Sequence, residues 1–303
     1  MVPPYAVRDG LTVATEQGRI CSLAARGQRD LQKRVAAYPK LFPNPPVDDA
    51  MLSALALSTA FIAPWCTAEQ LRVANRASLW ITAEDWRIDN VAATVDEVEA
   101  TVSACLSVAD GDAPAEEDEL GQFLAEIRDE LATTASFGAV QPLWREEVRR
   151  VLTADAREWR WRAARATDET QLPTFAEYLA NADNYGATFV NVSHWIATGD
   201  EDTLDHLPEL IAASREVQQV LRLVNDLASY ERDLKSGDLN GLMLGVDRDD
   251  IQRRVADRIS QCRDLLDSSV EALCPQQAHY LAREIGFTTG FYHGTDFWGS
   301  FER

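Results

Sequence analysis

The chain has 303 residues, of which 46% are hydrophobic, so it is long enough to bury one large core or two small ones. Its 49 acidic and 29 basic residues leave a net charge of −20. This balance argues against a nucleic-acid-binding protein, because such a protein needs a basic stripe on its surface. The five cysteines form no Cys-x-x-Cys pair. We therefore expect reduced, mostly buried thiols in a cytoplasmic protein.

The N-terminal third of the sequence predicts three helices. Residues 1–10, MVPPYAVRDG, show no signal-peptide pattern and are expected to form an irregular arm. A helix is expected over residues 11–38, and Asp48 can cap a second helix that ends before Pro64. Thr67 can open a third helix that continues to residue 91. The most apolar stretch, residues 50–66, is too short for a membrane span, so we expect a buried helix there.

The remainder of the chain keeps the helical period. Apolar spacing predicts helices over residues 96–106, 119–137, 142–166, 173–197, 207–235, 249–273 and 276–293. No segment shows the alternation that is typical of a strand, and no linker rich in Pro, Gly or Ser divides the chain. The sequence therefore predicts an all-α protein in which residues 1–303 form a single domain.

The segment RLVNDLASYERDLKSGDLN, residues 222–240, carries three polar residues on one helix face. Asn225, Ser229 and Asp233 are four residues apart, so an amide oxygen, a hydroxyl and a carboxylate point to one side. These are hard oxygen donors of the kind that Mg²⁺ binds. Gly237 lies where a left-handed cap would end the helix. A solvated polar face is the alternative interpretation of the three residues.

A second group of acids lies upstream, in the segment WITAEDWRIDN of residues 80–90. Asp85 and Asp89 are one helical turn apart, and Glu84 precedes them. Their neighbours include two tryptophans and two isoleucines, which is an apolar setting for a solvated face. Two carboxylates on adjacent turns can bridge divalent ions that neutralise their repulsion. An exposed acidic surface near Arg87 is the alternative.

Both segments resemble the metal-binding motifs of class I terpene synthases. The downstream run matches (N/D)D-x-x-(S/T)-x-x-x-(E/D), with Asn225, Ser229 and Asp233 at the ligand positions. The upstream run is similar to the aspartate-rich D-D-x-x-D motif, but it has a Glu first and one extra residue before the last acid. The resemblance covers the chain from around Pro64 to its end. It implies a single-domain helical bundle with a central apolar pocket between the two motifs.

The resemblance also implies a function. A class I terpene cyclase ionises a prenyl diphosphate with Mg²⁺, in a cluster of about three ions, and cyclises the carbocation that results. Arg222 stands where family members often hold a diphosphate-contacting arginine, and Arg232 and Lys235 flank Asp233; a salt bridge or a solvated role is an equal alternative for each. The implied metal ligands are Glu84, Asp85, Asp89, Asn225, Ser229 and Asp233, with Asp85 first among the upstream acids.

Further stretches resemble the kaurene-synthase-like diterpene synthase branch of the family. EYLANADNYGA is similar to an E-Y-x-x-N-A run of kaurene synthases, with Gly186 at the effector glycine position and Ala182 where many bacterial members have an arginine. Phe291 and Tyr292, followed by Asp296, resemble an F-Y-x-x-x-D ending. The implied substrate is geranylgeranyl diphosphate, or a copalyl-type diphosphate that a separate class II diterpene cyclase supplies. A sesquiterpene synthase that uses farnesyl diphosphate is the alternative.

Pocket-lining candidates are large aromatic residues at helical spacing and the effector glycine, namely Phe61, Trp80, Gly186, Phe189, Trp195, Tyr292 and Trp298. Ordinary core packing is the alternative for each aromatic residue. The run from Asp247 to Asp250 spells the D-x-D-D motif of class II cyclases, but acids also suit the start of a helix, and capping is the better interpretation. A non-catalytic protein with decayed motifs, and a homodimer, stay open.

Overall fold

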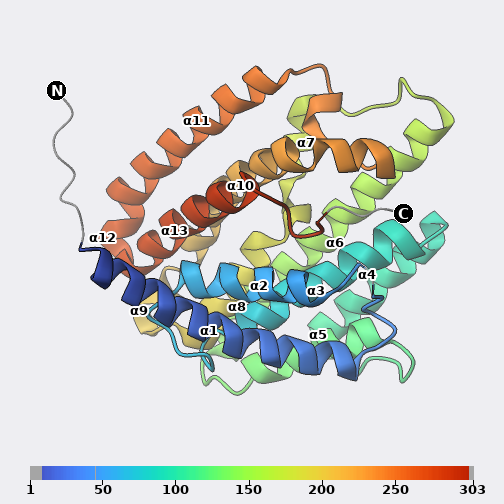
Figure 1. Cartoon of the computed structure of the whole chain (residues 1–303). Coiled ribbons are helices and arrows are strands. Elements are labelled where there is room, and N and C mark those ends of the chain that lie inside the picture. The colour runs from blue at the N-terminus through green and yellow to red at the C-terminus, as the bar shows by residue number, and fades with distance from the viewer. Residues whose placement is uncertain (1–8, 45, 300–303) are drawn as a thin grey trace, which may run out of the picture.

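The computed structural model describes residues 9–44 and 46–299, and helices make up its architecture (Figure 1). Within these ranges no strand forms, which confirms the all-α prediction. Residues 1–8 of the expected arm lie outside the described residues, and Gly10 already belongs to the first helix. The longer helices are α1 Gly10–Ala37, α2 Asp49–Ile62, α3 Arg72–Trp86, α4 Val95–Asp110, α5 Glu119–Leu131, α6 Phe137–Thr167, α8 Ala187–Thr198, α10 Leu207–Ser236, α11 Arg248–Leu265 and α13 Pro275–Tyr292.

Short elements connect these helices. They are the π-helical turns η1 Arg87–Val91 and η4 Leu266–Val270, the 3₁₀ turns η2 Ala182–Tyr185 and η3 Gly241–Met243, and the short helices α7 Phe175–Ala180, α9 Glu201–Asp205 and α12 Glu271–Leu273. None of the described helices combines the length and the apolar composition that crossing a bilayer requires.

Several helix ends follow from local capping. The Asp48 carboxylate accepts a hydrogen bond from the Met51 backbone N–H at 2.9 Å and starts α2. Asp247 does the same for the Asp250 N–H at 2.7 Å, which confirms that the acids there cap α11. Gly237 has a φ of +87° and ends α10, in the conformation that a residue without a Cβ adopts most readily.

The predicted helix over residues 173–197 is interrupted. It consists of α7, the turn η2 and α8, and Gly186 joins the last two with a φ of +73°. A Cβ at Gly186 would lie 2.7 Å from the side chain of Ile81 on α3, so the glycine also allows the two segments to approach closely. A second difference is that α6 begins at Phe137 and includes Pro142, which we expected to start that helix.

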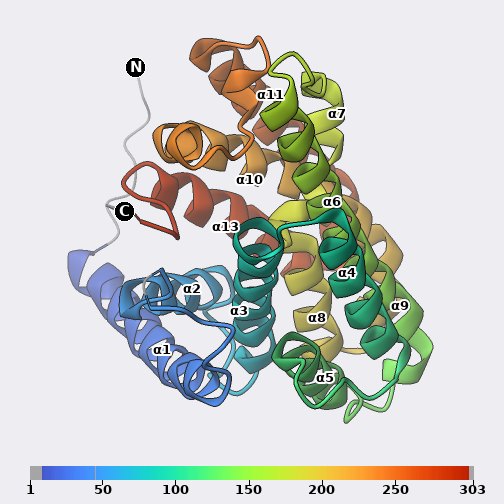
Figure 2. The same ribbon diagram turned by 90° about the vertical axis from the view of Figure 1, so that its right-hand side faces the viewer.

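The helices pack around a central space (Figures 1 and 2). In both views α1, α2 and α3 lie on one side and α10, α11 and α13 on the other, and α8 contacts both α3 and α10. α4, α5 and α6 pack behind α3 and α8, where most of the fully buried large side chains lie. The chain that follows α13 turns back between α13 and α3. The described residues thus form a single helical domain.

Candidate active site

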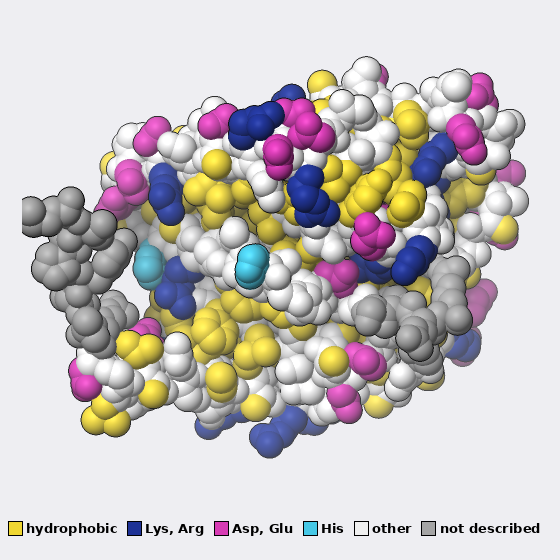
Figure 3. Space-filling model, turned by 45° about the horizontal axis from the view of Figure 1, so that its top comes forward, with side chains coloured by type: hydrophobic (Ala, Val, Ile, Leu, Met, Phe, Trp, Pro, Cys, Tyr) yellow, Lys and Arg dark blue, Asp and Glu magenta, His cyan; other side chains and the backbone are white. Residues whose placement is uncertain are grey.

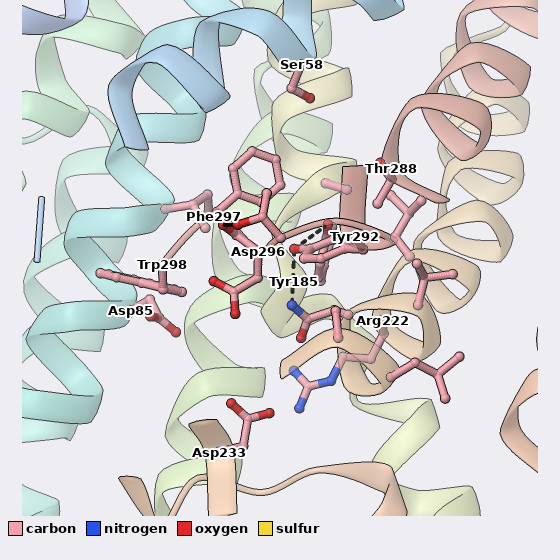
Figure 4. Close-up of a pocket in the computed structure, with 18 of the residues that line it drawn as sticks. Ser58, Asp85, Tyr185, Arg222, Asp233, Thr288, Tyr292, Asp296, Phe297 and Trp298 are labelled. Carbon is pink, nitrogen blue, oxygen red and sulfur yellow. Dashed lines mark hydrogen bonds between the residues drawn. The ribbon is translucent and has the colours of Figure 1, made fainter. Parts of the chain in front are cut away.

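A pocket of about 1210 Å³ lies in this central space. Its walls come from α2, α3, η1, α6, η2, α8, α10, α11 and α13 and from residues 293–299. Figure 4 shows that it has two ends: Asp85, Asp233 and Arg222 lie at one, whereas Ser58 and Thr288 lie at the other, with Tyr292 between them. We call the first the acidic end and the second the far end.

Asp85 and Asp89 both line the acidic end of the pocket. Asp85 lies on the last turn of α3, and Asp89 lies in the π-helical turn η1 that continues it. Burial and the nearby carboxylates of Asp238 and Glu158 raise the pKa of Asp85 to about 7. Burial and the charge of Asp85 raise the pKa of Asp89 well above its ordinary value. The two carboxyls thus sit where added positive charge would be stabilising.

Glu84 does not share this face. One residue along a helix corresponds to a turn of about 100°, so its side chain points away from the pocket and is fully buried. It faces Asp155 of α6, and burial raises the pKa of Glu84 to about 8. The expectation that Glu84 is a metal ligand is therefore not supported by its position, whereas Asp85 and Asp89 lie as expected.

Asn225, Ser229 and Asp233 share one side of α10, as their spacing predicts. The Asn225 amide donates to the hydroxyl of Tyr292 at 3.1 Å. Ser229 is fully buried, and its hydroxyl donates to a carboxylate oxygen of Asp233 at 2.5 Å. Asn240, from the loop after α10, donates to the same oxygen at 2.9 Å. Asn225 and Asp233 line the pocket, and Ser229 lies just behind them.

Three basic side chains reach the acidic end from α10. Arg222 is buried and donates to both carboxylate oxygens of Glu158 at 3.0 and 3.1 Å and to the hydroxyl of Tyr178 at 2.8 Å. The salt-bridge alternative for Arg222 is thus realised, yet its side chain still lines the pocket. Arg232 pairs with Asp233 at 3.0 Å, and Lys235 is exposed at the rim.

The structure brings a further arginine to the acids. Arg162 of α6 lies 3.3 Å from a carboxylate oxygen of Asp89 and 2.7 Å from one of Asp238. It therefore joins the upstream motif to the loop that follows the downstream motif. Sequence reasoning missed Arg162 because it belongs to no motif and lies about 70 residues from either partner. Its spacing of four residues from Glu158 was the one available signal.

The segment after α13 closes one side of the pocket. Asp296 pairs with Arg232 of α10 at 2.9 Å, and the ring of Trp298 lies 6.1 Å from that of Trp86 at the end of α3. Phe297 stacks on Phe291 at 4.6 Å. The segment thus contacts both helices that carry the motifs, which its sequence position alone did not indicate.

Only some of the expected pocket aromatics reach the pocket wall. Tyr292 and Trp298 line it, and Gly186 lies behind the lining residue Ile81. Phe61 packs against Phe287 at 5.7 Å instead. The remaining candidates are Trp80, Phe189 and Trp195, and each has at most 1% of its surface exposed. They are core residues because α3 and α8 turn their side chains toward α5, α6 and α13 rather than toward the pocket.

The donors at the acidic end suit a hard divalent cation. In residues 9–44 and 46–299, no three His, Cys, Asp or Glu side chains converge into a complete metal site. Mg²⁺ does not require one, because it is usually bound by one or two carboxylates, waters and substrate phosphates. Burial, and after it the charge of neighbouring carboxylates, raises the pKa values of Asp85 and Asp89, and a bound cation would stabilise their ionised forms. The side chains present therefore fit such an ion.

The face that lies at the top in Figure 1 and is turned toward the viewer in Figure 3 carries charges of both signs. In Figure 3, acidic and basic side chains are interspersed among exposed apolar side chains on this face. The net charge of −20 is therefore not gathered there into one acidic patch. Local cations such as Arg222 and Arg232 can attract an anion in spite of the overall charge.

Comparison with known proteins gives the family. The profile described as terpene synthase family 2, C-terminal metal binding, matches residues 77–264, which include both acidic motifs. The chain therefore belongs to this family and is a class I terpene synthase, an enzyme that acts on prenyl diphosphates.

Individual relatives agree with this assignment. An ent-pimara-9(11),15-diene synthase from Streptomyces sp. (strain KO-3988) is 28% identical over 89% of this chain and 91% of its own length. A linalool/nerolidol synthase from Streptomyces clavuligerus, solved with 2-fluorogeranyl diphosphate, shares the fold with a TM-score of 0.68 and 16% identity, over 90% and 94% of the two chains.

A plant enzyme shares the fold as well. Isoprene synthase from grey poplar (Populus x canescens), solved with three Mg²⁺ ions and a thiolodiphosphate, has a TM-score of 0.67 and 16% identity over 90% of this chain. The present chain spans about half of that protein, 55% of its length.

Proposed function

We propose that this terpene synthase is a Mg²⁺-dependent diterpene cyclase. The observation that carries the proposal is the pocket of about 1210 Å³, which has the two oxygen-donor motifs at one end and apolar residues such as Leu55 and Val190 in its walls. Its volume exceeds the ~300–1,000 Å³ of most small-molecule pockets, so it has room for a twenty-carbon chain. The similarity to a synthase whose name specifies a pimaradiene supports a diterpene substrate.

The proposed metal ligands are Asp85 and Asp89 on one side and Asn225, Ser229 and Asp233 on the other. When bound there, Mg²⁺, in a cluster of about three ions, would supply the Lewis acid that stabilises charge on a departing diphosphate. Tyr292 orients the Asn225 amide, and Asn240 and Ser229 orient the Asp233 carboxylate.

The basic side chains would bind the diphosphate. Arg222 is held in place by Glu158 and Tyr178, so it can meet an anion without first losing side-chain entropy. Arg232 and Lys235 lie beside Asp233 and would neutralise further charge. Trp298 and Tyr292 present aromatic surface, which stabilises a carbocation without supplying a nucleophile.

Substrate choice separates the remaining alternatives. We propose geranylgeranyl diphosphate or a copalyl-type diphosphate, the latter delivered by a separate class II cyclase. The resemblance of the EYLANADNYGA and Phe291–Asp296 segments to the kaurene-synthase-like branch favours these substrates over farnesyl diphosphate.

The test is product analysis. Purified protein is incubated with Mg²⁺ and, separately, with farnesyl, geranylgeranyl and copalyl diphosphates, and released diphosphate and organic products are measured. A cyclic hydrocarbon or alcohol from a C20 substrate is the expected result. A cyclic product from farnesyl diphosphate alone would replace the diterpene proposal by a sesquiterpene synthase, and no turnover at all would leave a non-catalytic member of the family.

Asn225→Ala provides the matching variant. Loss of this proposed ligand should lower kcat/KM by about 100-fold or more, because the charge developing on the diphosphate loses stabilisation. Asn44→Ala, on an exposed loop, is the matched control and should behave as the wild type. Full activity of Asn225→Ala would contradict the assignment of the downstream motif.

A further inference from the structure

A carboxyl group lies at the far end of the pocket, away from both metal motifs. Glu284 lines the pocket from α13 and is 5% exposed. It lies two helical turns, about 12 Å along the axis, from Tyr292, whose hydroxyl contacts Asn225. Thr288, one turn from each, is at the far end in Figure 4, opposite Asp233 and Arg222.

The hydrogen bonds of Glu284 orient it as an acceptor. Asn191 of α8 donates to a Glu284 carboxyl oxygen at 2.9 Å and to the Ser214 hydroxyl at 3.0 Å. In this arrangement the amide oxygen of Asn191 accepts from the Tyr280 hydroxyl at 2.8 Å, which leaves the amide nitrogen to face Glu284. Asn191 is the single hydrogen-bond partner that the described residues give this carboxyl, and none of their basic side chains pairs with it.

Beyond the hydrogen-bonded side chains of Asn191, Ser214 and Tyr280, apolar residues share the pocket wall with Glu284. Leu55, Ile62, Val190 and Leu221 line the pocket with it. A buried acid without a countercharge is costly, so the packing of this region would be more stable with an uncharged residue. The Glu284 carboxyl is therefore placed where it can meet the hydrocarbon part of a substrate bound in the pocket.

We propose that the Glu284 carboxylate is the base that removes the last proton from the cyclised carbocation, an assignment that rests on the proposed cyclase function. A carboxylate oxygen takes a proton from a carbon next to the cationic carbon. The C–H bond breaks, and its electron pair becomes the new C=C bond. The products are a neutral olefin and protonated Glu284, which returns its proton to water after the olefin leaves.

The acid–base behaviour of the region supports this role. Burial raises the pKa of Glu284 to about 8, so its ionised form is a stronger base than an ordinary carboxylate. The nearby titratable groups do not interfere: burial lowers the pKa of His194 to about 4, raises that of Cys66 to about 11 and raises those of Tyr185 and Tyr280 well above 10. Among these five groups, Glu284 is therefore the one whose pKa lies nearest neutral pH.

Glu284→Gln is the first test, because the amide can keep the hydrogen bond to Asn191 but cannot act as a base. Released diphosphate and product ratios are measured with the substrate that the wild type turns over. We expect diphosphate release to continue while the share of the principal olefin falls by about 10-fold or more, in favour of other olefins or water-trapped alcohols. Glu284→Asp, which retains a carboxylate, should restore part of that share. An unchanged product ratio in Glu284→Gln would overturn the proposal.

A matched control and a second readout guard against a folding defect. Glu147→Gln removes a buried carboxylate that pairs with Arg215 outside the pocket, and its product ratio should equal that of the wild type.

In the wild type, the share of the principal olefin should rise with pH through about 8, because Glu284 accepts a proton only when ionised. A share that does not change with pH would contradict the proposal without any variant. If the wild type turns over nothing, the cyclase function itself fails, whereas turnover without these effects removes Glu284 alone.

Discussion

At the scale of single residues, Tyr292 connects the downstream motif to the pocket wall. Its hydroxyl accepts hydrogen bonds from the Asn225 amide at 3.1 Å and from the Tyr185 hydroxyl at 3.3 Å. With its amide nitrogen donating to Tyr292, Asn225 keeps its amide oxygen available as a metal ligand. A tyrosine from a distant part of the chain thus positions a proposed metal ligand.

Tyr292→Phe should therefore lower the affinity for Mg²⁺ more than it slows the reaction at saturating Mg²⁺. Groups that orient a ligand typically contribute 10–100-fold to metal affinity, so we expect the Mg²⁺ concentration for half-maximal rate to rise by about 10-fold. Tyr185→Phe is the matched control, since it removes a hydroxyl but leaves the Asn225 contact, and its Mg²⁺ dependence should stay near that of the wild type. Equal Mg²⁺ curves for Tyr292→Phe and the wild type would contradict the positioning role.

At the scale of helices, the interruption at Gly186 positions α8 against α3. The left-handed conformation at φ +73° and the contact with Ile81 both require a residue without a side chain. Gly237, at φ +87°, shares the conformation but has open space around it. The two glycines separate the effect of backbone strain from the effect of close packing.

Gly186→Ala should lower the free energy of unfolding by about 3 kcal/mol, because the strained backbone and the overlap with Ile81 both contribute. Gly237→Ala should lower it by only about 1 kcal/mol, since strain acts alone there. Denaturant unfolding of the two variants and the wild type measures the difference. Equal losses in the two variants would mean that the contact with Ile81 does not constrain the helix break.

At the scale of the whole molecule, the acidic end joins parts of the chain that are far apart in sequence. Arg162 links Asp89 to Asp238, and Arg232 links Asp233 to Asp296. α3, α6, α10 and the segment after α13 therefore meet around one charged region. A ligand that binds this region should stabilise the whole fold, because it binds the native state alone.

Mg²⁺ and inorganic diphosphate together should therefore raise the melting temperature. At about 100 times the dissociation constant, binding adds ~2.7 kcal/mol, or several degrees for a domain of this size. Thermal unfolding is measured with each ligand alone and with both, and we expect the large shift only with both. Asp85→Ala should lose most of that shift. The same shift from diphosphate without Mg²⁺ would contradict a metal-dependent site.

Much of this protein can be predicted from local patterns in its sequence. The helical period, the caps at Asp48 and Asp247 and the oxygen donors of α10 depend on residues within one or two turns, and local interactions are sufficient to specify them. The acidic pair Asp85 and Asp89 could be placed on one helix face for the same reason.

Other features required the packing of the complete chain. Helix rotation turned Glu84 and Trp80 away from the pocket. Long-range contacts brought Arg162 to the carboxylate of Asp89, and they brought Asp296 and Glu284 into the pocket wall. Spacing along one helix specifies which residues share a face but not what that face contacts. That depends on how side chains from helices remote in sequence fill the same volume, which is a property of the assembled core.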